Sequence, residues 1–313
     1  MVVALRVGEA VELGHPLVLR FADAVDARVL FIKGASLEHH GLRAPHASAD
    51  VDVLVEPARF DALVASLQES GWHERAKAPH EDAFITHSTT LVRDGWPCDL
   101  DVHRAYPGFL ADPATVFEAL WERREPLVRA GHEVPIPDRA SSALILALHS
   151  LRGSAKVPRH AHELDALVER LQGADTSELD DLVDLARATG AAATAAPFLE
   201  RIGVDVRADV AAAAAAGDPE FTSWRRRIES GATVAHFYAE LVDQTPWYRM
   251  PRLVFRALWP TEAEFRVIRP ETPPGRRAAL AGRWRRIARG LRDAPRVVRA
   301  RRRVAREQRT AAL

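Results

Sequence analysis

Helical and extended patterns of hydrophobic positions alternate along the first part of the chain. Apolar residues recur at helical spacing from Val7 to about Ala27, and the β-branched, apolar run 29–32 that follows predicts a buried strand. Residues 35–41 predict a short helix, and the alternation from Asp50 to Val55 predicts a second strand. Pro57 then opens an amphipathic pattern that predicts a helix ending near Gly71.

A hairpin, a short extended pair and a long helix follow in the pattern. Residues 83–93 and Cys98–His103 are rich in β-forming residues, and Asp94-Gly95 between them is a turn signal, so we expect an antiparallel pair. Residues 127–136 predict another short extended pair, after which Asp138 is expected to cap a helix. The chain is therefore predicted to have an α/β (α+β) fold whose N-terminal part contains a small mixed β-sheet.

Helical periodicity dominates the rest of the chain. We expect helices at residues 164–171, 179–189, 191–216 and 237–242. The segment from Pro273 onward is helix-prone and strongly enriched in arginine, with few acids. These patterns predict three parts: a sheet domain at residues 1–137, a mainly helical domain at 138–272, and an Arg-rich tail at 273–313 that is helical or disordered.

Composition narrows the class of protein without identifying it. The 313 residues are 47% hydrophobic, enough for a substantial core, and no apolar run approaches the roughly 20 residues of a membrane span. The N-terminal sequence has acids where a signal peptide has an apolar stretch, so we expect a cytoplasmic protein. The single cysteine, Cys98, excludes an internal disulfide and a thiolate zinc ribbon. Carboxylates and histidines remain as candidate metal ligands.

Charge is balanced overall but unevenly distributed. Basic and acidic residues number 43 each, which argues against a surface built entirely for nucleic acid. The Arg-rich segment after Pro273 has three interpretations: a solvated disordered tail, a helix that docks on an acidic partner or a membrane surface, or a nucleic-acid contact. The last two interpretations both require an anionic partner or surface.

Two of the expected strands carry acidic residues at alternate positions. In Asp50-Val51-Asp52 the period of two places both carboxylates on one face and the valine on the other. Cys98–His103 repeats this pattern, with Asp99, Asp101 and His103 on one face. Each motif alone also fits an exposed edge strand whose charges deter aggregation, or an isolated calcium-type site.

The two acidic strands predict a metal site if their polar faces coincide. Three or four carboxylates then converge, and cations must neutralise their repulsion. Magnesium suits an all-oxygen site, with manganese as a substitute, and two such ions about 3.5–4 Å apart support in-line displacement at phosphorus. Lys33-Gly34 ends the first expected strand and opens a helix, where backbone N–H groups favour a phosphate. The same two residues also fit an ordinary strand-to-helix turn with a solvated lysine.

Lys33-Gly34, Arg43, Asp50–Val55 and Leu100–His103 occur in this order along the chain. The order resembles that of the bacterial nucleotidyltransferase-like proteins of the DNA polymerase β superfamily. Their pattern is Lys-Gly after a strand, an arginine, Asp-x-Asp-Leu-Leu-Val and later Val-Asp-Leu-His. The resemblance departs after Gly34, where the wider superfamily has serine or glycine in place of an alanine. A hydroxyl contact to phosphate is therefore expected from Ser36 or elsewhere.

The resemblance implies roles for individual residues. It implies that the catalytic carboxylates, which would bind two Mg²⁺ ions, are Asp50, Asp52 and Asp101. The residues that contact the triphosphate are Lys33, Gly34, Ser36 and Arg43. Accessory candidates on the second acidic strand are Asp99 and His103.

The activity that the resemblance implies is transfer of a nucleoside monophosphate from a nucleoside triphosphate to a hydroxyl-bearing acceptor. That acceptor is a small molecule, a peptide or a protein, and the sequence does not select among them. Two alternatives remain open. One is a catalytically inactive binding protein with a nucleotidyltransferase fold, and the other is a protein that binds nucleic acid or membrane through its basic tail.

Overall fold

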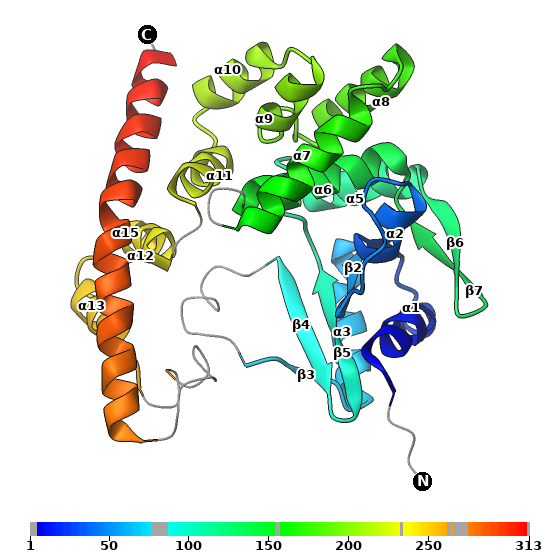
Figure 1. The fold of residues 1–313 in the computed structure, drawn as a ribbon, viewed down its shortest axis with the longest axis horizontal. Helices are drawn as coiled ribbons and strands as arrows, with labels where there is room; N and C mark the ends of the chain where they lie inside the picture. Colours follow the sequence, from blue (N-terminus) through cyan, green and yellow to red (C-terminus); the bar gives the residue numbers. More distant parts are fainter. Residues whose placement is uncertain are drawn as a thin grey trace. The chain divides into compact units, whose positions relative to one another are not determined.

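A five-stranded mixed sheet with the order β1-β2-β5-β4-β3 carries the N-terminal part of the protein (Figure 1). The structure is a computed structural model that describes residues 5–76, 87–153, 157–231, 234–261, 265 and 275–311. Its strands are β1 Val29–Ile32, β2 Asp50–Val55, β3 His73–Glu74, β4 Ser88–Arg93 and β5 Trp96–His103. β2 and β5 pair in parallel, whereas the other neighbouring strands are antiparallel. The mixed sheet and the helices confirm the expected α/β (α+β) class.

The apolar face of this sheet packs on α1 Val7–Ala24 and α3 Phe60–Glu69. Alternate residues of the central strands, among them Val51 and Leu100, are buried in this core. Gly14 allows α1 to lie close to β2, since a Cβ there would lie 2.9 Å from Cγ2 of Val51. The alternation of the strands leaves the acidic residues on the other face.

Short elements connect the strands and helices of this part. They are α2 Gly34–His39, the 3-10 turn η1 Pro57–Arg59, α5 Pro113–Glu122, and the hairpin of β6 Glu125–Arg129 with β7 His132–Ile136. The side chain of Asp112 caps α5 by accepting the backbone N–H of Ala114 at 2.9 Å. The hairpin was expected at 127–136 and begins two residues earlier.

Helices make up the chain after the hairpin. They are α6 Arg139–Gly153, α7 Pro158–Leu171, α8 Thr176–Ala188, α9 Ala196–Leu199, η2 Glu200–Ile202 and α10 Arg207–Ala215. The continuous helix expected at 191–216 is wrong. Gly203 ends η2 in the left-handed conformation, with φ at 88°, and so separates η2 from α10.

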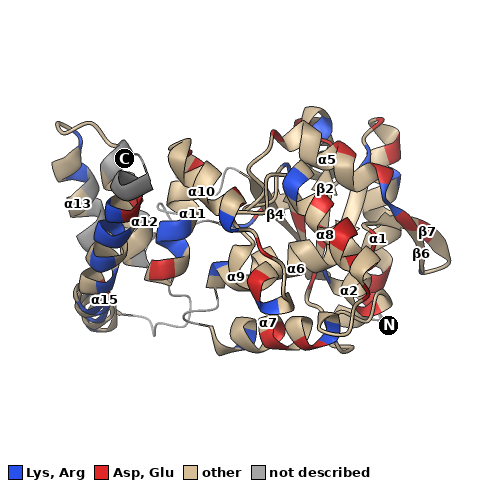
Figure 2. Cartoon of the chain, turned by 90° about the horizontal axis from the view of Figure 1, so that it is seen from above, with Lys and Arg blue, Asp and Glu red and all other residues tan. Residues whose placement is uncertain are grey.

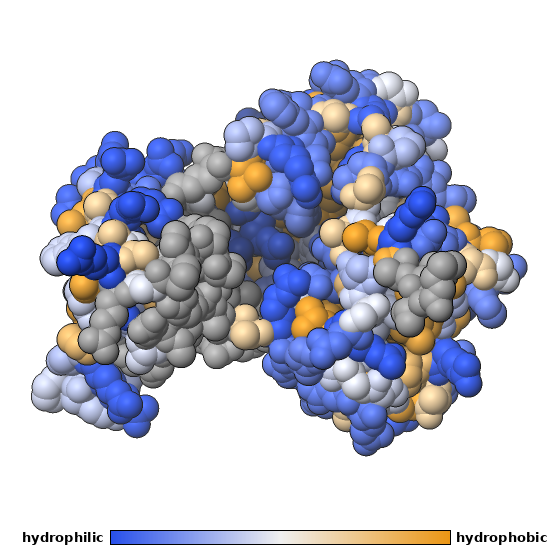
Figure 3. Space-filling model, turned by 60° about the horizontal axis from the view of Figure 1, so that its bottom comes forward, coloured by the Kyte–Doolittle hydropathy of each residue, from blue (hydrophilic) through white to orange (hydrophobic). Residues whose placement is uncertain are grey.

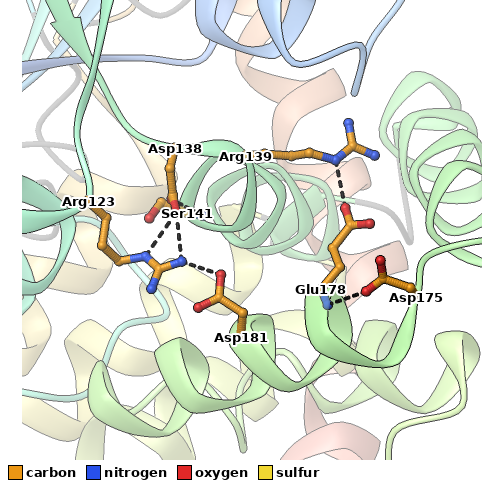
Figure 4. Close-up of polar contacts among 7 residues, drawn as sticks. All are labelled: Arg123, Asp138, Arg139, Ser141, Asp175, Glu178 and Asp181. Atoms are coloured by element: carbon orange, nitrogen blue, oxygen red, sulfur yellow. Dashed lines mark hydrogen bonds and ion pairs between the residues drawn. The ribbon is translucent and has the colours of Figure 1, made fainter.

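Charged contacts at the start of α6 fix this helix on its neighbours (Figure 4). Asp138 caps α6, as expected, by accepting a backbone N–H of the first turn at 2.9 Å. Arg123, just after α5, donates to Asp138 at 2.7 Å and also pairs with Asp181 of α8. Arg139 donates to Glu178 of α8 at 2.7 Å. These contacts join α5, α6 and α8 into one layer.

The described residues form two compact units. The first contains residues 5–75 and 87–213. The helices of the second are α11 Pro219–Ser230, α12 Val234–Gln244, α13 Met250–Leu258 and α15 Arg276–Ala311. The three-part division at residues 137 and 272 remains a prediction.

The Arg-rich segment is a helix and not a disordered tail over residues 276–311. This helix, α15, packs on α11 and α12 within the second unit and buries Ala279, Val297, Ala300 and Val304. Its arginines are drawn blue in Figure 2. On the face shown in Figure 3, hydrophilic side chains predominate and apolar ones form small separate areas. Within the described ranges, no helix is long and apolar enough to cross a membrane.

Candidate active site

The parallel pairing of β2 with β5 brings the two acidic motifs together. Asp52 lies opposite Asp101 and Asp50 lies opposite Asp99 in the register of the two strands. The intervening residues, such as Val51, point into the core. The sequence predicted that the two polar faces could coincide, and the register shows that these residues share one face of the sheet.

Asp52 is the most buried of these acids and contacts two nitrogen donors. Nζ of Lys33 lies 2.5 Å from its Oδ1, and Nε2 of His103 lies 3.2 Å from the same oxygen. Burial disfavours the charged carboxylate, but Lys33 and His103 outweigh it and hold the pKa of Asp52 well below its usual range. Asp52 is therefore a buried anion that is already matched by a cation.

Asp101 completes a cluster of ligand atoms with Asp52 and His103. One ligand atom from each of the three residues lies within 4.8 Å of the other two. Oδ1 of Asp101 accepts the Thr90 hydroxyl at 2.5 Å, from the neighbouring strand β4. Lys33, His103 and Thr90 each contact Oδ1 of their aspartate, and none of these three contacts uses Oδ2 of Asp52 or Asp101. The two carboxylates of this cluster fit a divalent cation that prefers oxygen ligands.

Asp50 and Asp99 lie at the edge of this cluster. Asp50 accepts the Ser48 hydroxyl at 2.9 Å, and burial together with the charge of Asp52 raises its pKa. Burial and the charge of Asp52 thus disfavour a negative charge on Asp50, and a nearby cation would oppose this effect. Asp99 pairs with the exposed Arg75 instead. Of the four acids, Asp52 and Asp101 are the two whose ligand atoms lie within 4.8 Å of one another and of a His103 nitrogen.

The turn between β1 and α2 holds Lys33 in an unusual backbone conformation. Lys33 has φ 60° and ψ −153°, and Gly34 has φ 41°. A positive φ is rare for a residue with a Cβ and costs on the order of 1–3 kcal/mol, so the surrounding structure must impose it. This conformation accompanies the contact between the Lys33 ammonium and Asp52.

Two serine hydroxyls, those of Ser36 and Ser48, lie near this turn. Ser36 is buried, and its hydroxyl donates to the carbonyl of Lys33 at 2.8 Å, which fixes the turn. The hydroxyl of Ser48 lies 4.0 Å from the position that a Cβ on Gly34 would occupy. Ser48 therefore presents a hydroxyl beside Gly34 that the sequence reasoning did not single out. A phosphate contact by Ser36 stays a prediction.

Arg43 lies on the side of the site formed by α7. Its Nη1 is 3.9 Å from Oε1 of Glu163, and its buried Nε has no hydrogen-bond partner among the described residues. The charge of Asp52 acts on Arg43, but burial is the larger effect and lowers the Arg43 pKa. The fold thus brings Arg43 within electrostatic range of Asp52 without a direct contact.

The comparison with known families identifies the family of the chain. The sequence profile of a family described as "Uncharacterised nucleotidyltransferase" matches residues 17–202, more than half of the chain. The chain belongs to this nucleotidyltransferase family. The match covers the sheet, the acidic cluster and helices α6 to α8, so both motif-bearing strands and the surrounding helices lie within the family region. No curated protein matches the chain.

Solved structures of nucleotidyltransferases are distantly similar to this family member. The lincosamide antibiotic adenylyltransferase LnuA, solved with lincomycin bound, is 13% identical with a TM-score of 0.34, covering 50% of this chain and 94% of its own. An antigenic nucleotidyltransferase-like protein from Paracoccidioides brasiliensis is 15% identical with a TM-score of 0.35, covering 58% and 93%. The antibiotic-resistance factor ANT(2'')-Ia is 15% identical with a TM-score of 0.38, covering 57% and 91%. None of these likenesses assigns a substrate to this chain.

The sequence reasoning missed two further residues of the site. Tyr106 is buried with its hydroxyl unpaired among the described residues, and burial raises its pKa, while the charge of Lys33 acts in the opposite direction. Thr90 donates to Asp101 from β4. Thr90 had a signal in the sequence, because the expected hairpin register places β4 beside the second acidic strand. Tyr106 had none, because it lies in the loop after β5.

Proposed function

We propose that this protein transfers a nucleoside monophosphate from a nucleoside triphosphate to a hydroxyl-bearing acceptor, with two Mg²⁺ ions or Mn²⁺ in their place. The observation that carries the proposal is the register of β2 and β5, which sets Asp52 opposite Asp101 on the polar face of the sheet. Membership of a nucleotidyltransferase family supports the same reaction class. The acceptor is a small molecule, a peptide or a protein.

Asp50, Asp52 and Asp101 are the residues that would hold the metal ions. The donor set fits, because clustered carboxylates with a raised pKa at Asp50 favour added positive charge. When bound, the ions would supply charge neutralisation at the triphosphate and at the departing pyrophosphate. His103 orients Asp52 through its hydrogen bond, and Thr90 orients Asp101.

The remaining residues would position the triphosphate and receive a proton. Lys33, Gly34 and Arg43 would contact the phosphates, with a hydroxyl from Ser36 or Ser48. Asp101 would accept the proton of the acceptor hydroxyl while the oxygen of that hydroxyl forms a bond to the α-phosphorus. The bond between the α-phosphorus and the oxygen that bridges it to the β-phosphorus would break, and pyrophosphate would leave with the electron pair of that bond. Asp99 is left as an accessory residue because Arg75 neutralises it at the surface.

The test is an assay of the purified full-length chain with each of the four ribonucleoside triphosphates, labelled at the α-phosphate. We expect triphosphate binding and pyrophosphate release in Mg²⁺ or Mn²⁺, with label transferred to a component of a cell extract. Both should be lost in EDTA, because the carboxylates repel the phosphates without cations. Equal binding in EDTA would contradict the metal proposal. Metal-dependent binding without turnover under any condition would instead favour the inactive binding protein.

A second proposal concerns helix α15, whose exposed apolar residues favour a membrane surface as its partner. Leu280, Trp284, Leu291 and Val298 are exposed, and the last three are seven residues apart, so all lie along one side of the helix. The side chains buried within the unit, such as Val297, lie on another side. An apolar stripe flanked by arginines is the pattern of a helix that lies in the interface of an anionic bilayer.

Co-sedimentation with lipid vesicles tests this second proposal. The protein should bind vesicles that contain phosphatidylserine and not purely zwitterionic ones. Trp284→Glu combined with Leu291→Glu should abolish binding, because it removes the apolar contact while every arginine of α15 remains. Binding to single-stranded nucleic acid that survives this double substitution, without vesicle binding by the wild type, would overturn it in favour of a nucleic-acid partner.

A further inference from the structure

A second group of metal-ligating side chains lies where the end of α6 packs on the start of α7. His149 belongs to α6, and His160 and Glu163 belong to α7. His160 and Glu163 are three residues apart and therefore share one face of α7. One ligand atom of each of the three residues lies within 4.8 Å of the other two. The reaction proposed above assigns no role to this group.

Each of the three side chains has a buried polar atom that is unpaired within the described part of the chain. Nδ1 of His149, Nδ1 of His160 and Oε2 of Glu163 have no hydrogen-bond partner among the residues that the structure describes. Leaving a buried polar atom unsatisfied is costly, and buried polar groups are nearly always paired. Unpaired buried polar atoms on all three members of the cluster favour a ligand that the three side chains share.

The charge state of the cluster suits a metal ion. Burial, Lys33 and Arg152 together lower the pKa of His149 to about 2, and burial lowers the pKa of His160. A lowered pKa favours the neutral imidazole, which is the form that binds metals. Arg43 and Arg159 contact Oε1 of Glu163, at 3.9 and 3.3 Å, and leave Oε2 available.

Gly153 makes the position of the His160 ring possible. A Cβ on Gly153 would lie 2.1 Å from Nδ1 of His160, closer than any real contact. The imidazole thus packs directly on the backbone at the end of α6. Any side chain at residue 153 would displace the ring from His149, whose own ring centroid lies 4.8 Å away.

We propose that His149, His160 and Glu163 form a second metal site, selective for a transition-metal ion of the Zn²⁺ type and separate from the acidic cluster. Two imidazoles and one carboxylate are a ligand set of zinc, whereas Mg²⁺ prefers oxygen ligands and binds imidazole poorly. Three protein ligands leave a fourth position open to water or to a substrate group. The site would join α6 to α7 beside Arg43, so its occupancy would also fix the end of α6.

The experiment is a Zn²⁺ titration of the full-length protein by calorimetry, in excess Mg²⁺, with Co²⁺ absorption as a second probe. We expect one tight equivalent of Zn²⁺ and a Co²⁺ spectrum typical of nitrogen and oxygen ligands. His160→Gln should weaken Zn²⁺ binding by at least about 10–100-fold. Loss of a group that only supports a metal ligand already lowers metal affinity by that factor. Gly153→Ala should do the same while it keeps every ligand, because the added methyl group displaces the His160 ring.

Two controls distinguish this site from others on the same chain. His39→Ala removes a surface histidine that could bind Zn²⁺ with His40 and Glu125, and it should leave the tight equivalent unchanged. Asp101→Asn should also leave it unchanged, whatever happens to nucleotidyl transfer, so failure here and failure of the proposed reaction are distinguishable. The proposal is overturned if the wild type binds no tight Zn²⁺, or if binding is lost in His39→Ala or Asp101→Asn and kept in His160→Gln and Gly153→Ala. Circular dichroism of each variant confirms folding.

Discussion

At the scale of the residue, the carboxylate of Asp52 determines the electrostatics of the site. It is buried, and it is matched by Lys33 at 2.5 Å and by His103 at 3.2 Å. A buried anion needs a positive partner, and a lysine or a metal ion can serve. The proposed metal ions and Lys33 therefore compete for one carboxylate, and Lys33 becomes available to a phosphate when metal takes its place.

Lys33→Met tests this competition. In EDTA the variant should be less stable than the wild type by about 3–5 kcal/mol, because it leaves Asp52 buried and unpaired. Mg²⁺ should restore more stability to the variant than it adds to the wild type, since the ion now has no competitor. Urea unfolding with and without Mg²⁺ measures both effects. Arg75→Met is the matched control: its exposed pair with Asp99 should be worth less than about 1 kcal/mol and show no Mg²⁺ dependence.

Asp101→Asn tests the catalytic assignment. The substitution keeps the size of the side chain and its contact with Thr90 while removing one charge, so the protein should fold as before. Transfer should fall by more than about 100-fold, because even groups that merely support a metal ligand matter by 10–100-fold. Triphosphate binding should fall much less, since the metal acts chiefly in the transition state.

Asp99→Asn is the comparison for that experiment, because Asp99 shares the face of β5 but pairs with Arg75. It should retain transfer near the wild-type rate. The opposite result, with Asp99→Asn inactive and Asp101→Asn active, would mean that the wrong acid of β5 was chosen. No change in either variant would remove the basis for an enzyme at this cluster.

At the scale of the element, the site depends on how closely α1 lies against β2. Gly14→Ala should destabilise the protein by about 1–3 kcal/mol, since its Cβ would lie 2.9 Å from the stiff, buried side chain of Val51. Gly8→Ala lies in the same helix with nothing within 4 Å, and should be neutral or stabilising by less than about 1 kcal/mol. Chemical denaturation of both variants measures the difference. Equal stability of the two would show that α1 moves away from the sheet at little cost.

Most strands and helices were predictable because their hydrophobic period is strong, although no strand was expected at β3. β1 and β2 have the expected bounds, and the acidic alternation correctly placed Asp52 and Asp101 on polar faces. α5 and α11 were missed although each begins with an Asp-Pro pair, Asp112-Pro113 and Asp218-Pro219, that is a helix start signal.

Other features of the site had no local signal in the sequence. The ion pair of Lys33 with Asp52 depends on the turn after β1 and on the antiparallel register of β1 with β2. The burial of Tyr106 depends on the loop that follows β5. The contact of His160 with Gly153 depends on how α7 packs on α6. Such contacts join residues whose spacing in sequence carries no period, so only the tertiary structure defines them.

At the scale of the whole molecule, the two compact units predict two unfolding transitions in calorimetry. Gly14→Ala should lower the temperature of only one of them, which belongs to the unit that contains the sheet. Mg²⁺ with a bound triphosphate should raise the temperature of that same transition, because the proposed ligands all lie there. A single transition that shifts as a whole in both experiments would show that the units unfold together.

The parallel pairing of β2 with β5 also determines when the site forms as the chain folds. Strands β4 and β5 are joined by a tight turn, whereas parallel partners need a long connection, and Asp52 and Asp101 are about 50 residues apart in sequence. Closing such a loop is a late and slow event compared with forming a hairpin. Asp52 and Asp101 are therefore apart until β2 pairs with β5, and the proposed metal site forms only with that pairing.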